Sequence, residues 1–145
     1  MKPPPRILVV DAAILTAAVL GRSSSAFIVA GAERVLITTD RAVAETRRRL
    51  ELGLQRTDLL QPLQKLLSNI EIVPVELIDA LIERAERALR EAVPSRNGSV
   101  SDAHLLALAW DAVAEIWSHD RDFAGTGVAS WSTENLLAAV AEASG

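Results

Sequence analysis

The sequence predicts an α/β protein in three layers, with helices on both faces of a five-stranded parallel sheet. Two observations lead to this prediction. Short apolar runs recur along the chain, beginning with residues 7–10, and each has the length of a strand that is buried on both faces. Segments with helical spacing of apolar residues separate these runs. Strands that alternate with helices are typical of a parallel sheet.

The expected strands are residues 7–10, 34–38, 71–75, 115–118 and 128–131. Helices are expected at 12–20, about 23–31, 41–52, 58–67, 77–92, 102 to about 113, and 132 or 133 to 143. Capping and terminating residues set several of these bounds, among them Thr39-Asp40 before the third helix, Gly53 after it, and Pro94. The Pro-rich residues 1–5 are expected to form a disordered lead-in to a single domain spanning 1–145. These local patterns leave the order of the strands in the sheet open.

The composition excludes several classes of function. The chain of 145 residues has no Cys, which rules out a disulfide framework, a zinc finger and a thiol nucleophile. Its two His are too few for a His-rich zinc site. The net charge of −4 is wrong for a simple electrostatic binder of nucleic acid, and aromatic content of 3% is too low for a base-stacking platform. Any activity on nucleic acid must rely on local Arg clusters and a cation in an acidic pocket.

The apolar N-terminal region superficially resembles a signal peptide. Asp11 interrupts it, and it contains no cleavage zone of small residues. The run is also too short and too interrupted to cross a bilayer. We therefore expect a cytoplasmic protein that does not associate with a membrane.

Four acids are expected at or near the carboxyl edge of the sheet. Asp11 follows the first strand, and Asp120 follows the fourth. Asp102 opens the helix that leads into the fourth strand, and Glu45 lies in the helix after the second. Open α/β sheets build their ligand crevices at this edge. If the first and fourth strands are neighbours, Asp11 and Asp120 face the same crevice.

Carboxylates that are brought together repel one another, by roughly 4 kcal/mol at about 4 Å and an effective dielectric constant near 20. Either one of them is protonated or a cation neutralises them. Ligands that are all oxygen favour Mg²⁺ or Mn²⁺. Each acid alone has an ordinary structural explanation, since Asp102 can favour the helix dipole and Glu45 can pair with an Arg of its own helix.

Four segments in this order resemble the PIN-domain nucleases, and in size the VapC-type toxin ribonucleases. They are residues 9–15, 38–45, 101–109 and 118–123, of which the last two are the more specific. The resemblance implies that Asp11, Glu45, Asp102 and Asp120 form the family's catalytic quartet, with Asp11, Asp102 and Asp120 as metal ligands. It also implies a sheet in the order 3-2-1-4-5, which places the first and fourth strands side by side.

Three further residues are candidates for accessory roles: two match positions of the family, and one lies between two of the acids in the sequence. Asp122 matches a position that is frequently acidic, and Ser118 matches a Ser or Thr that helps orient the site. Arg121, between two acids, is a candidate contact to an RNA phosphate. Ala13 stands where many members of the family carry Asn, Ser or Thr.

The predicted function is that of a Mg²⁺- or Mn²⁺-dependent endoribonuclease, the toxin of a toxin–antitoxin pair. Its expected partners are an RNA substrate, a cognate antitoxin and a second copy of the chain in a homodimer. The alternative is a PIN-fold module that binds RNA or protein without nuclease activity. His104 is a candidate for assisting proton transfer, although a His on a helix face is more often structural. Exposed apolar surface on helices 58–67 or 77–89 would mark a groove for a dimer partner or the antitoxin.

Overall fold

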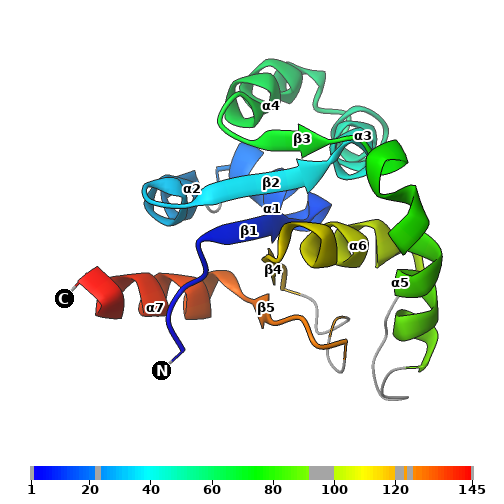
Figure 1. Cartoon of the computed structure of the whole chain (residues 1–145). Helices are drawn as coiled ribbons and strands as arrows, with labels where there is room; N and C mark the ends of the chain where they lie inside the picture. The colour runs from blue at the N-terminus through cyan, green and yellow to red at the C-terminus, as the bar shows by residue number, and fades with distance from the viewer. Residues whose placement is uncertain (1, 22–23, 92–99, 120–122, 124–125, 145) are drawn as a thin grey trace.

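The structure is a computed structural model, and it describes residues 2–21, 24–91, 100–119, 123 and 126–144. Its centre is a five-stranded sheet in the order β3-β2-β1-β4-β5, in which every neighbouring pair is parallel (Figure 1). The strands are β1 (Ile7–Val10), β2 (Val35–Thr39), β3 (Glu71–Val73), β4 (Glu115–Trp117) and β5 (Ser130–Trp131). The predicted fold class and strand order are confirmed.

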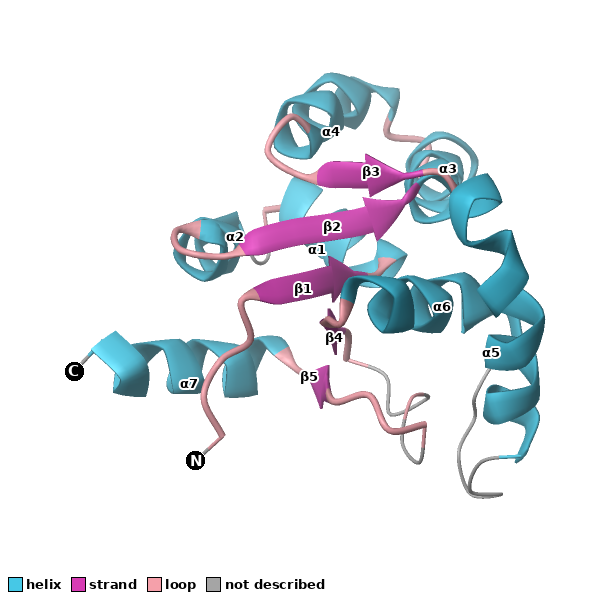
Figure 2. Ribbon diagram, viewed as in Figure 1, coloured by secondary structure: helices cyan, strands magenta, loops and turns pink. Residues whose placement is uncertain are grey.

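Helices cover both faces of the sheet (Figure 2). The α-helices are α1 (Ala12–Val19), α2 (Ser24–Gly31), α3 (Asp40–Arg48), α4 (Leu60–Leu67), α5 (Asp79–Glu91), α6 (Ala103–Ala112) and α7 (Thr133–Ser144). Shorter turns adjoin them: the π-helical η1 (Arg49–Gly53) and the 3₁₀ turns η2 (Thr57–Leu59), η3 (Val75–Ile78) and η4 (Val100–Asp102).

Successive side chains of the central strand pack alternately into two separate hydrophobic cores. Leu8 and Val10 of β1 pack with residues of α1, α2, α4 and α7. Val9, between them, packs on the other face with residues of α5 and α6. This is the two-residue period of a strand that is buried on both sides. The continuous apolar run at residues 7–10 is therefore explained by the two cores.

Local signals predicted some bounds better than others. β1 has the predicted bounds, and Thr39 caps α3 as expected, since its Oγ1 accepts a hydrogen bond from the Ala42 amide at 3.0 Å. The helix expected at 41–52 ends as an α-helix at Arg48 and continues as the π turn η1. β3 and β5 are shorter than predicted, because pairing with their single neighbours β2 and β4 extends over only part of each apolar run.

The N-terminal lead-in is described from Lys2 onward. The Lys2 ammonium pairs with the Glu115 carboxylate and lies 5.8 Å from the centre of the Trp131 ring. Within the described part of the chain, every helix is too short or too polar to cross a bilayer.

Candidate functional site

Asp11 lies at the carboxyl end of β1, where the strand turns into α1. Its backbone N–H donates to the Trp117 carbonyl of β4 at 3.3 Å, so the contact between the two strands extends to this residue. The side chain is buried, with 6% of its surface exposed, and Oδ1 accepts from the Ile14 amide at 2.8 Å. Asp11 is therefore the N-cap of α1 as well as a candidate ligand, and the positive end of that helix favours its negative charge.

The carboxyl end of β4 lies directly beside Asp11. Ser118 is buried there, and its backbone N–H donates to the Trp131 carbonyl of β5 at 2.9 Å. His119 follows, with its Nε2 3.3 Å from the Thr133 hydroxyl of α7. The same hydroxyl accepts from the Trp117 indole N–H at 3.0 Å. These contacts anchor the start of the segment that leads to the next acid.

Three predicted site residues, Asp120, Arg121 and Asp122, lie outside the described residues. Their sequence positions place Asp120 two residues after the buried Ser118. The side-by-side arrangement of β1 and β4, on which the shared-crevice argument depended, is confirmed. The roles of these three side chains stay predictions.

Asp102 lies at the junction between η4 and α6 and occupies the N-cap position of α6. One buried hydrogen bond locates this end of the helix: the Thr39 hydroxyl, at the end of β2, lies 2.7 Å from His104 Nδ1. The first turn of α6 is thus held at the carboxyl edge of the sheet. The predicted position of Asp102 near that edge is consistent with this contact.

His104 is buried, with 2% of its surface exposed. Burial, together with the nearby positive charge of Arg41 and against a smaller opposing effect of Asp40, lowers the pKa of His104 to about 4. The imidazole is therefore neutral at pH 7. Its contact with Thr39 supports the structural explanation for this residue.

Glu45 lies in the second turn of α3 and is partly exposed. Its Oε1 pairs with Arg49 Nη2 at 3.0 Å, and 39% of the Glu45 side chain is accessible to solvent. This is an ion pair within α3, which is the ordinary structural role expected for Glu45. Such exposed pairs contribute about 0.3–0.5 kcal/mol, so the pairing holds Glu45 only weakly.

The described acids do not by themselves form a metal centre. Among the described residues, no three His, Asp or Glu side chains lie close enough together to hold an ion. Asp11, Glu45 and Asp102 therefore need a further contribution or a rearrangement to share one. The available donors are carboxylate oxygens, which suit Mg²⁺ or Mn²⁺, and the Nδ1 of His104 is already engaged by Thr39.

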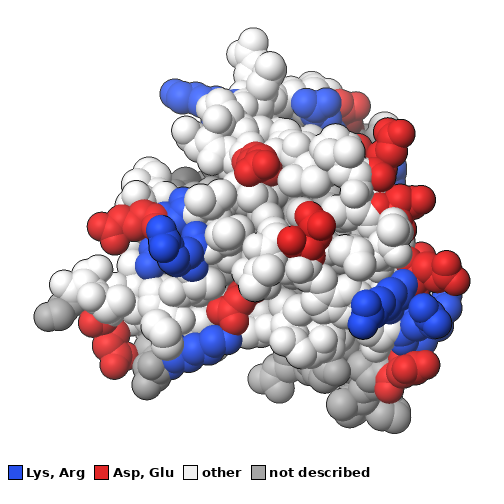
Figure 3. All heavy atoms as spheres, viewed as in Figure 1, with Lys and Arg blue, Asp and Glu red and all other residues white. Residues whose placement is uncertain are grey.

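The surface charge is mixed on the face shown in Figure 3. Lys and Arg side chains form separate small patches there, most of them beside Asp or Glu. On α3, Arg47 and Arg48 are exposed. This pattern agrees with the net negative charge and favours local rather than extended contacts with an anionic polymer.

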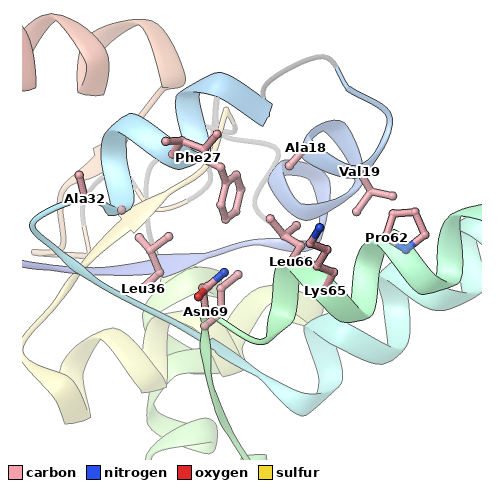
Figure 4. A pocket seen from close by; sticks show the side chains of 12 residues that line it. Ala18, Val19, Phe27, Ala32, Leu36, Pro62, Lys65, Leu66 and Asn69 are labelled. Carbon is pink, nitrogen blue, oxygen red and sulfur yellow. The ribbon is translucent and has the colours of Figure 1, made fainter.

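A groove of about 630 Å³ lies between α1, α2 and α4 (Figure 4). Phe27, Leu36 and Leu66 line it with other apolar residues, and Lys65 and Asn69 add polar groups. It reaches Ala18 and Val19 in the last turn of α1, whereas Asp11 caps the first turn. The groove and the candidate site therefore lie toward opposite ends of α1.

Comparison with known proteins identifies the class to which this arrangement belongs. A family profile described as PIN domain matches residues 9–141. The chain belongs to the PIN-domain family, as the sequence segments predicted. A comparison with curated proteins finds no match.

Several solved structures share the fold. The VapBC2 structure from Rickettsia felis, bound to a DNA fragment from its promoter, has a TM-score of 0.69 at 12% identity, covering 87% of this chain and 98% of that one. Mycobacterium tuberculosis VapC20, described as a Sarcin-Ricin loop cleaving toxin, has a TM-score of 0.64 at 19% identity, covering 83% and 95%. A protein from Pyrobaculum aerophilum has a TM-score of 0.61 at 20% identity, covering 93% and 89%. At these identities the likeness concerns the fold.

Proposed function

We propose that the protein is a divalent-metal-dependent endoribonuclease and the toxin of a toxin–antitoxin pair. The observation that carries the proposal is the contact between β1 and β4, where the Asp11 amide donates to the Trp117 carbonyl. This contact brings the end of β1 beside the end of β4, and Asp120 follows Trp117 by three residues in the sequence. Membership of the PIN-domain family supports the same assignment.

In this proposal Asp11, Asp102 and Asp120 hold Mg²⁺ or Mn²⁺, and Glu45 completes the acidic quartet. When bound there, the ion would supply Lewis-acid chemistry for the hydrolysis of an RNA phosphodiester. The N-cap hydrogen bond from the Ile14 amide orients the Asp11 carboxylate at the start of α1.

The accessory residues act around this quartet. Ser118 orients the site from the end of β4, and Asp122 adds negative charge. Arg121 contacts a phosphate of the RNA. Glu45 can join the acidic quartet once its ion pair with Arg49 breaks. This is feasible because the pair is exposed and weak.

The proposal is tested by incubating the purified protein with a panel of RNAs and Mg²⁺ or Mn²⁺. EDTA is expected to abolish cleavage. Asp11→Asn and Asp120→Asn are each expected to reduce the rate by at least about 100-fold. Asn is as good an N-cap as Asp, so Asp11→Asn is expected to preserve the helix start.

Asp111→Asn is the matched control, because Asp111 is an exposed acid in the last turn of α6, away from the helix end that contacts Thr39. Its cleavage rate is expected to equal that of the wild type. Cleavage that survives both Asp11→Asn and Asp120→Asn would overturn the site assignment. Binding of RNA without cleavage, by a folded and metal-loaded sample, would instead favour the alternative of a binding module.

The partner we propose is an antitoxin that inserts an apolar segment into the groove between α1, α2 and α4. Ile28, at the rim of this groove, leaves 75% of its surface exposed, and α4 is one of the helices expected to provide such a surface. An antitoxin encoded immediately upstream of this gene would fit the proposal. We also propose that the protein forms a homodimer and is located in the cytoplasm. Analytical ultracentrifugation tests whether it is a dimer.

A further inference from the structure

We propose that the Thr39 hydroxyl is a positioning group for the candidate metal site, because it joins the helices that carry Glu45 and Asp102. The juxtaposition is a buried contact among the end of β2, the start of α3 and the first turn of α6. This inference rests on the proposed function and concerns how that site is held in place. Thr39 itself is not proposed as a ligand.

Thr39 makes two hydrogen bonds through its side-chain oxygen. Its Oγ1 accepts from the Ala42 amide in the first turn of α3, at 3.0 Å. The same oxygen lies 2.7 Å from His104 Nδ1 in α6. A hydroxyl has one hydrogen to donate and two lone pairs, and the Ala42 contact uses one lone pair. The oxygen can therefore bond His104 Nδ1 in either tautomer, as donor to a bare Nδ1 or as acceptor from Nδ1–H.

Burial makes this contact durable. Thr39 has no exposed surface, and His104 has only 2%. Water cannot readily replace either partner, so a separated hydroxyl and imidazole would both be left unsatisfied in an apolar environment. Thr39 also lies at the end of β2, in register with Val73 of β3. The anchor for both helices is thus part of the sheet.

The rest of the α6 interface is less directional. Residues Ala103, Ala107 and Ala109 are small and buried, and the other inward residues are aliphatic. Apolar burial stabilises the helix against the sheet but depends little on its exact rotation or shift along its axis. A 2.7 Å hydrogen bond does depend on both. We therefore assign the register of α6 on the sheet to the Thr39–His104 contact.

The two candidate ligands lie close to this contact along the chain. Asp102 immediately precedes α6, two residues before His104, and Glu45 is in the second turn of α3. Metal sites tolerate displacements of only about 0.5 Å. Loss of residues that orient metal ligands typically lowers metal affinity by about 10- to 100-fold. Loss of the Thr39–His104 contact is expected to fall near the lower end of that range.

Four variants separate the contact from general packing. Thr39→Val removes the hydroxyl while keeping the branched shape, and His104→Leu removes the imidazole while leaving the Thr39 cap of α3 intact. Thr39→Ser restores the hydroxyl, and His104→Asn places an amide oxygen near the position of Nδ1. Thr38→Val is the matched control. Thr38 is equally buried, and its hydroxyl donates to the Val10 carbonyl at 2.7 Å rather than to α6.

Two measurements are made on the full chain under conditions where circular dichroism shows every variant folded. The Mn²⁺ dissociation constant is obtained from the electron paramagnetic resonance signal of free Mn²⁺. The side-chain ¹⁵N shifts of His104 report its tautomer in the metal-free protein. We expect Thr39→Val to shift the Nδ1 resonance of His104, whichever tautomer the wild type shows.

We expect Thr39→Val and His104→Leu each to weaken Mn²⁺ binding by about 10-fold, and the double variant to be no weaker than either. Thr39→Ser and His104→Asn are expected to recover most of the affinity, and Thr38→Val to stay within about twofold of the wild type. Affinities of Thr39→Val or His104→Leu equal to wild type would overturn this inference alone. So would a Thr38→Val loss as large as theirs. A wild type that binds no Mn²⁺ would overturn the proposed function, and this inference with it.

Discussion

The two faces of the sheet are covered in different ways. On one face, α6 is packed against β1, β2 and β4, and its residues from Ala103 to Ala109 are all buried. On the other face, α1 buries four residues, and an apolar groove of about 630 Å³ stays open between it, α2 and α4. Both helices begin at a candidate ligand, Asp102 for α6 and Asp11 for α1.

This difference indicates that the two faces of the sheet have different roles. The α6 face contains the buried polar contact of Thr39 with His104, and packing there leaves little freedom for the end that carries Asp102. The α1 face holds Asp11 by a local cap and keeps its remaining apolar surface accessible. One face is suited to fixing a site and the other to receiving a partner.

The largest expected effect on folding is a truncation in the buried face. Leu106 in α6 has no exposed surface, so Leu106→Ala is expected to lower the free energy of unfolding by about 2–5 kcal/mol. Leu66→Ala, at the groove, is expected to lower it by less than about 1.5 kcal/mol, because that side chain is already partly exposed. Urea denaturation measures both. Equal losses would contradict the contrast between the faces.

The next effect is a pH dependence that belongs to the α6 face. The pKa of His104 is about 4 in the folded protein and 6.5 in the unfolded chain, so the unfolded chain binds more protons between these values. Stability is therefore expected to fall as the pH drops from about 6.5 toward 4, by about 3 kcal/mol in total. Urea denaturation in EDTA at several pH values tests this.

His104→Asn is the control for that dependence, since Asn does not titrate. Its free energy of unfolding is expected to change less over the same pH range. A variant with the wild-type slope would show that other groups cause the dependence.

A smaller contrast concerns how the two helices end. Gly21 follows α1 at φ 85°, a conformation that glycine adopts readily, whereas Val113 follows α6 at φ 52° with 90% of its surface exposed. A β-branched residue is strained there. Val113→Gly is expected to raise the free energy of unfolding by about 1 kcal/mol, and Gly21→Ala to lower it by about 1 kcal/mol. Thermal denaturation would show shifts of opposite sign, and shifts of the same sign would refute the explanation.

The smallest effect on folding is expected at the groove rim. Ile28→Asp removes an exposed apolar side chain and is expected to change the free energy of unfolding by less than about 0.5 kcal/mol. If the proposed antitoxin inserts into this groove, the same change is expected to abolish its co-purification, because it places a charge in an apolar contact. Val29→Asp is not a suitable control, since Val29 is the sequence neighbour of Ile28. Val113→Asp, on the opposite face, is suitable and is expected to leave co-purification unchanged.

Local sequence patterns predicted the order of the helices and strands, several of their bounds and the resemblance to the family. The apolar run of β1, the Thr39 cap of α3 and the segments around Asp11 and Asp102 each depend on neighbouring residues, and the structure and the family match agree with them. The strand order came from the resemblance rather than from these patterns. Asp120, Arg121 and Asp122 lie outside the described residues, so their part of the site is still a prediction.

Only the tertiary structure decided which distant residues meet. The pairing of β1 with β4, the contact of Thr39 with His104, and the groove between α1, α2 and α4 all join segments that are far apart in the chain. Periodicity and capping signals extend over a few residues and contain no information about such contacts. His104 illustrates this: its residue type allowed either proton transfer or a structural role, and its burial against Thr39 favours the structural one.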